Sequence, residues 1–115
     1  MKALYALTVA AVAAAAQPAL ADRRIYAGRE ASAVKCAAYF SYVAFMGERL
    51  GVASSTSKQA GAEIGTYILV QHVSGTWREK VGAYNVMIDR LPEDASLFDD
   101  ATRHLGWCRR EFLPS

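Results

Sequence analysis

The sequence predicts an exported all-α domain: a small four-helix bundle, or an irregular array of four helices, held by one disulfide between Cys36 and Cys108. Three observations lead to this fold. Residues 1–21 have the pattern of a secretory signal peptide. The rest of the chain contains four segments with the apolar periodicity of helices. Two cysteines, an even number, are typical of a small exported domain with a disulfide.

The leader is recognised by the order of its parts. Lys2 gives a short positive start, residues 3–16 form an uncharged apolar run, and Ala19-Leu20-Ala21 places small residues at a cleavage site. The run is shorter than the roughly 20 apolar residues that span a bilayer, and no second apolar segment follows. We therefore expect cleavage after Ala21, no transmembrane segment after cleavage, and a single domain over residues 22–115 in the periplasm or outside the cell.

The net charge and the size of the chain indicate which partners it lacks and how stable it is. The chain carries 13 Lys and Arg against 11 Asp and Glu, a formal net charge of +2. This near balance, with basic residues scattered along the chain, predicts no nucleic-acid partner. A domain this small buries only about 60–65% of the surface of its unfolded chain, so we expect modest stability without a covalent link.

Residues 29–50 form the first predicted helix, with Gly28 or Ser32 as its cap and Gly51 just past its end. No charged residue occurs from Cys36 to Gly47. A helix that is apolar on nearly every side is either central in its domain or covered by a partner.

Complete burial of one helix is hard to arrange in a domain of this size. We therefore expect the face that carries Tyr39, Tyr42 and Met46 to be exposed in part and to serve as an interaction surface. The alternative is that both tyrosine rings pack inside and keep their hydroxyl groups in water.

The second predicted helix covers residues 58–73, after a connector in which Ser55, Thr56 or Ser57 acts as the cap. A strand over residues 66–73 is the alternative, because that part is rich in β-branched and aromatic residues. Ser57, Gly61 and Gly65 form a small-residue stripe that would allow another helix to approach. In a chain outside a membrane we expect the glycines mainly to cost helix stability.

The third and fourth helices have clearer borders. Thr76 and Glu79 match a capping box, and Pro92 ends the third helix. Asp94 is placed to cap the fourth. The inner face of the third helix is predicted to contain Trp77, Val81, Tyr84, Ile88 and Leu91, and that of the fourth Leu97, Phe98, Ala101, Leu105, Cys108 and Phe112.

The cysteines connect the elements. In an up-down-up-down arrangement the first and fourth helices are antiparallel neighbours. Cys36 lies near the start of the first helix and Cys108 near the end of the fourth, so the arrangement and the disulfide predict each other. The loop of about 70 residues that the bond closes is worth on the order of 4 kcal/mol.

Few residues suggest chemistry. The two histidines, His72 and His104, have no nucleophile or ligand motif around them. Asp100 and His104 are four residues apart, which predicts a surface pair on the helix, and His72 is expected to be partly buried. We therefore expect no catalytic site, no metal and no cofactor.

Two aromatic features remain. Trp77 and Trp107 with Tyr84 would line a pocket for an apolar ligand, although ordinary packing is the simpler explanation. Trp107 stands beside the cysteine of the fourth helix and near Arg109 and Arg110. An exposed Trp beside two arginines is suited to binding another protein.

These features lead to four hypotheses. The first is a non-enzymatic binding module whose partner is another envelope protein or a second copy of the chain. Its interaction surface would comprise Tyr39, Tyr42, Met46, Trp107, Arg109 and Arg110. The second is a carrier of a small apolar ligand between its helices. An enzyme or metal protein that uses both histidines is the third, and a stress chaperone is the fourth, although two histidines and balanced charge make a weak pH switch.

Overall fold

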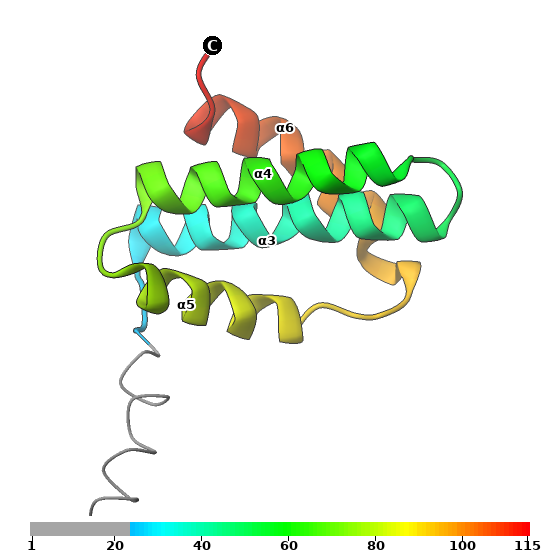
Figure 1. Ribbon diagram of the computed structural model, residues 1–115. Helices are drawn as coiled ribbons and strands as arrows, with labels where there is room; N and C mark the ends of the chain where they lie inside the picture. Colours follow the sequence, from blue (N-terminus) through cyan, green and yellow to red (C-terminus); the bar gives the residue numbers. More distant parts are fainter. Residues whose placement is uncertain (1–23) are drawn as a thin grey trace, which may run out of the picture.

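The computed structural model describes residues 24–115, so the predicted leader, residues 1–21, and its cleavage site lie outside the described residues. The described part is all-helical, as predicted, and α4 continues to His72 in place of the alternative strand. No helix between residues 24 and 115 has both the length and the hydropathy needed to cross a bilayer. The elements are α3 (Gly28–Arg49), α4 (Ser55–His72), α5 (Trp77–Asp89), the 3-10 helix η1 (Ala95–Leu97) and α6 (Phe98–Phe112) (Figure 1).

The central element is α3, against which α4, α5 and α6 all pack. α4 and α5 flank it, and α6 crosses behind it (Figure 1). α4 and α5 meet only slightly. The fold is therefore the irregular four-helix array, with one helix inside and three around it. This explains why the long uncharged part of α3 is tolerated.

The disulfide between Cys36 and Cys108 is present and joins α3 to α6. It links residues 72 apart in sequence, its Cα atoms are 5.6 Å apart, and both cysteines are fully buried. At the opposite end of the same pair, Ala101 of α6 packs with Tyr42 and Met46 of α3. The two helices are therefore antiparallel neighbours, as the positions of the cysteines predicted.

The small-residue stripe of α4 faces α3. A Cβ atom added at Gly61 would lie 2.5 Å from the Cβ of Ala44 and 2.8 Å from the carbonyl oxygen of Phe40. One added at Gly65 would lie 3.0 Å from the carbonyl oxygen of Ala37. The expectation that these glycines mainly cost helix stability is therefore incomplete, because they bring the two backbones together.

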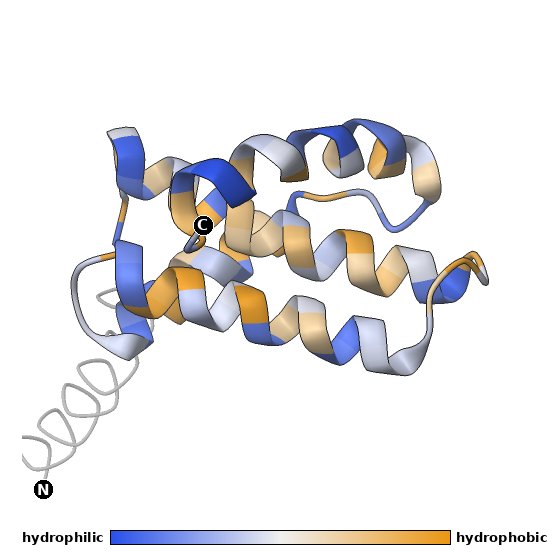
Figure 2. Cartoon of the chain, turned by 90° about the horizontal axis from the view of Figure 1, so that it is seen from above, coloured by the Kyte–Doolittle hydropathy of each residue, from blue (hydrophilic) through white to orange (hydrophobic). Residues whose placement is uncertain are grey.

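The main core lies where α3, α4 and α6 meet, and it is entirely apolar. The hydropathy colours of Figure 2 also show apolar residues on the exposed turn between α3 and α4, where Leu50 and Val52 are 48% and 72% exposed. The buried members of the core are Ala33, Val34, Cys36, Ala37, Phe40, Ile68, Leu69, Val73, Leu105, Cys108 and Phe112.

Helix borders follow local chemistry. The capping box of Thr76 and Glu79 is confirmed, and Gly51 has a φ of +75° just past α3, as expected of a helix end. The predicted caps of the first two helices are wrong by a few residues. Ala27 precedes α3 without a side-chain cap, and Ser54 caps α4 by accepting the N–H of Ser57.

Candidate functional site

The surface predicted on α3 is largely covered. Tyr42 and Met46 are only 6% and 3% exposed, and Tyr39 is half-buried. Leu97 packs against this cluster, and the Tyr42 hydroxyl donates a hydrogen bond to the carbonyl oxygen of Asp94 at 2.8 Å. The prediction that this face is exposed is therefore wrong, because the connector that contains η1 folds over it.

The end of α6 remains accessible. Trp107 is 37% exposed and stacks on His104, with ring centroids 5.2 Å apart. The Arg109 guanidinium lies 5.8 Å from the centroid of the Phe40 ring, and Arg110 is exposed. Of the surface predicted from the sequence, this is the part that the fold leaves open.

The pocket predicted from Trp77, Trp107 and Tyr84 is not formed. Trp77 begins α5 and is 49% exposed, whereas Trp107 belongs to α6. The two helices each pack mainly against α3 and hardly meet each other, so their tryptophans come from separate parts of the surface. Tyr84 lines a different groove, between α5 and the α3–α4 pair.

The least covered long helix is α5. It packs on the main core through Ala83, Tyr84 and Met87, yet none of its residues is buried. The side chains of Val81, Ile88 and Leu91, predicted to face inward, are only half-buried. The apolar residues of α5 form a broad arc around the helix axis. α3 covers only the middle of this arc and leaves both of its edges uncovered.

A groove of about 680 Å³ separates α5 from the α3–α4 pair. This volume lies within the range of about 300–1,000 Å³ typical of ligand pockets. We call it the first groove. Its apolar lining comes from all three helices and from the connector after α5: Tyr42, Phe45, Met46, Ala62, Tyr84, Ile88, Leu91 and Pro92.

Charges of opposite sign flank the first groove. On the α3–α4 side, the Arg49 guanidinium and the Lys58 ammonium group lie 5.7 Å and 5.2 Å from the centroid of the Phe45 ring, which is 43% exposed. On the α5 side are Asp89 and Glu93. The groove therefore has an apolar floor between a basic and an acidic rim. The two rims meet at one end, where Arg49 donates a hydrogen bond to the carbonyl oxygen of Glu93 at 3.3 Å.

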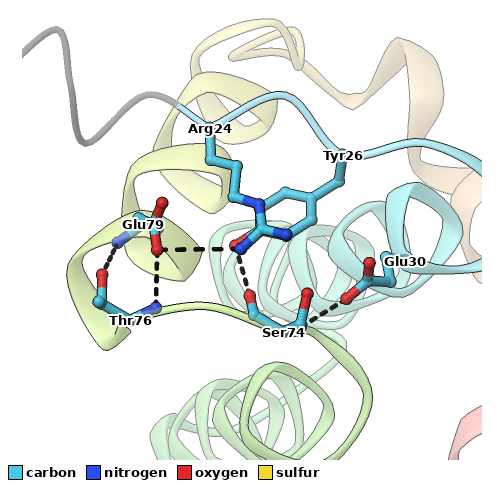
Figure 3. Close-up of polar contacts among 6 residues, drawn as sticks. All are labelled: Arg24, Tyr26, Glu30, Ser74, Thr76 and Glu79. Carbon is cyan, nitrogen blue, oxygen red and sulfur yellow. Dashed lines mark hydrogen bonds and ion pairs between the residues drawn. The ribbon is translucent and has the colours of Figure 1, made fainter.

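A second groove of about 380 Å³ lies on the other flank of α5, beside the N-terminal segment. A set of polar bonds, the N-terminal contact, holds that segment in place (Figure 3). The Tyr26 hydroxyl donates to the carbonyl oxygen of Ser74 at 2.7 Å, and the Ser74 N–H donates to Glu30 at 2.5 Å. Arg24 pairs with Glu79 at 3.9 Å.

The two carboxyl groups of the N-terminal contact have lowered pKa values. Hydrogen bonds from Ser74 lower the pKa of Glu30. The backbone N–H of Thr76, and to a smaller extent the charge of Arg24, lower the pKa of Glu79. The contact that holds the turn before α5 is therefore made by ionised carboxylates.

The histidines are separate and serve packing. A ring nitrogen of His72, which is half-buried as expected, lies 2.7 Å from the carbonyl oxygen of Phe112. Neither His72 nor His104 hydrogen-bonds to a carboxylate among the contacts within residues 24–115. The predicted pair of Asp100 and His104 is wrong, because Asp100 pairs with Arg103 and the His104 ring lies among aromatic rings.

One group of potential metal ligands occurs in the described residues. The sulfur atoms of Cys36 and Cys108 and a ring nitrogen of His104 all lie within 4.8 Å of one another. The two sulfurs are bonded to each other, so the oxidised protein offers only His104. Burial, and to a smaller extent the charge of Lys35, lower the pKa of His104 and so favour its neutral imidazole.

The sequence did not point to several residues that line the two grooves, because each helix was expected to have one inward-facing stripe. Phe45 was not part of the predicted interaction surface, and Val86 and Met87 were outside the stripe predicted for the third helix. The signal was available, since these two residues extend the apolar arc of that helix beyond what one neighbour can cover.

Comparison of the chain with protein-family models, curated proteins and solved structures finds no match. The case for the candidate site therefore depends on its geometry.

Proposed function

We propose that this chain is an exported, non-enzymatic interaction module that binds another protein through α5 and the first groove. One observation carries the proposal: α5 is an amphipathic helix with a broad apolar arc, and none of its residues is buried. A surface of this kind, bordered by polar residues, is typical of a protein-binding site.

The shape and charge of the first groove support a helical partner. Helix-in-groove recognition places the apolar face of one helix in an apolar channel, and the floor formed by Phe45, Tyr84 and Ile88 provides such a channel. Trp77 lies half-exposed at the start of α5, and tryptophan is enriched among residues that dominate binding energy. The basic and acidic rims would fix the direction of the bound helix.

The test is site-specific crosslinking in intact cells. A photo-reactive residue at position 88, in the first groove, is expected to capture a discrete partner protein. The same residue at position 63, exposed on α4, serves as the control and is expected to capture little. Equal capture at both positions, or none at either from a monomeric protein, would contradict the proposal.

A second candidate function is favoured by the volume of the first groove alone. A carrier of a small apolar ligand would use the same floor, with the ligand in place of a partner helix. Native mass spectrometry of the purified mature protein separates the two. A retained small molecule that is lost in Ile88→Asp supports the carrier, whereas the bare polypeptide mass counts against it.

A further inference from the structure

The disulfide has a third potential metal ligand beside it. His104 and Cys108 are four residues apart on α6, so their side chains share one face of that helix. Cys36 meets them from α3, and the two sulfurs and a ring nitrogen of His104 lie within 4.8 Å of one another. This places two sulfur ligands and one nitrogen ligand from two helices around one point.

We propose that, when the Cys36–Cys108 disulfide is reduced, the two cysteine sulfurs and a ring nitrogen of His104 bind one Zn²⁺ ion. Reduction by a dithiol supplies two electrons and two protons. The S–S bond breaks, two thiols form, and the reductant becomes a disulfide. Zn²⁺ then replaces the two thiol protons, which are released to solvent.

The required rearrangement is small. Zinc binds thiolate sulfur at about 2.3 Å and imidazole nitrogen at about 2.0–2.1 Å, so neighbouring ligand atoms are roughly 3.3–3.8 Å apart. The nitrogen already lies within reach of both sulfurs. The sulfur atoms need to separate and the ring nitrogen needs to approach them by no more than a side-chain adjustment, and Cα atoms 5.6 Å apart leave the cysteine side chains free to rotate. Neither helix has to leave its place.

The surroundings fit a neutral zinc centre. Two thiolates and one Zn²⁺ ion carry no net charge, so the nearby Lys35 does not oppose the metal. The His104 ring is held between Tyr39 and Trp107, which fixes its orientation. The group contains no fourth His, Cys, Asp or Glu from residues 24–115, so a water molecule would complete the tetrahedron, as in zinc sites with an open position.

This site is independent of the proposed partner surface, since none of its ligands lines the first groove. It exists only in the dithiol form of the chain. Oxidation by another disulfide, which takes up the two electrons, and two protons from solvent, and becomes a dithiol, removes two of the three ligands and releases the ion. The same two cysteines therefore give a structural bond in one redox state and a zinc site in the other.

The test uses the mature chain in both redox states. A phosphine reduces the disulfide and becomes a phosphine oxide, while water supplies the oxygen and the two protons, and excess phosphine is removed before metal is added. Zn²⁺ is then added, with Co²⁺ as a coloured substitute. The reduced protein is expected to bind one equivalent of metal and show sulfur-to-cobalt charge transfer, and Zn²⁺ should raise its melting temperature. The oxidised protein should bind none.

Variants identify the nitrogen ligand. His104→Ala is expected to weaken Zn²⁺ binding at least tenfold, His104→Cys to preserve it, and the control His72→Ala to leave it unchanged. Circular dichroism of each oxidised variant establishes that it folds. Absence of metal binding by the reduced wild-type chain, or unchanged affinity in His104→Ala, would overturn the proposal. If the reduced His104→Ala chain unfolds, binding by His104→Cys with a cobalt spectrum of three sulfur ligands decides the same question.

Discussion

The two sides of α3 are built differently. On one side, α4 and α6 are held by a buried apolar core, by close backbone approach at Gly61 and by a disulfide. On the other side, α5 contributes no buried residue and is anchored through the N-terminal contact. The contrast teaches that the side covered by α4 and α6 maintains the fold, whereas the α5 side leaves apolar surface accessible.

The same residue type illustrates the difference. Ile68 of α4 is fully buried in the core, whereas Ile88 of α5 is half-buried on the floor of the first groove. An apolar side chain left in water lowers stability compared with a buried one. A domain of this size retains such residues at the expense of stability, which fits a binding role for α5.

The largest loss of stability is expected from removing the disulfide, which lies on the side of α3 covered by α4 and α6. The double variant Cys36→Ala/Cys108→Ala should lower the free energy of unfolding by about 4 kcal/mol, because the bond closes a long loop in the unfolded chain. Urea unfolding monitored by circular dichroism measures the loss. A decrease below about 1 kcal/mol would mean that the two sides of α3 differ less than their structure implies.

A smaller effect is expected where α4 approaches α3. Gly61→Ala should lower the free energy of unfolding by about 1–3 kcal/mol, because the new methyl group meets the Cβ of Ala44 and the carbonyl oxygen of Phe40. Gly106→Ala is the matched control. Its methyl group would meet only Arg110 Nη1 at 3.6 Å, and alanine favours a helix over glycine by up to about 1 kcal/mol. Thermal melts that show equal effects would refute the close contact.

The smallest effect is expected on the α5 side, and it depends on pH. The folded-state pKa values of Glu30 and Glu79 lie below their ordinary value of 4.5. Their contribution to stability is therefore complete above that value and is lost as the pH falls through the folded-state pKa. Urea unfolding between neutral pH and about pH 3 should show a weaker acid dependence in Glu30→Gln/Glu79→Gln. Glu63→Gln, on the exposed face of α4, should behave as wild type.

The sequence predicted what depends on local pattern. The helical class, the capping box at Thr76 and the pairing of Cys36 with Cys108 follow from spacing and residue type. The burial of Tyr42 and Met46 does not, because it depends on where a connector of irregular structure lies in space. Local pattern likewise shows that α5 is amphipathic but not how much of its apolar arc a single neighbour will cover.

The hydrogen bond between Tyr26 and Ser74 has a consequence for the order in which the exported chain can fold. It joins residues 48 positions apart, and the disulfide joins residues 72 apart. A chain that crosses a membrane from its N-terminus delivers Tyr26 well before Ser74, and Cys36 well before Cys108. Under the proposed export, the first residues of the mature protein must therefore wait, unattached, for most of the domain to arrive. This interval ends only when Ser74 arrives and its carbonyl oxygen can accept the hydrogen bond from Tyr26.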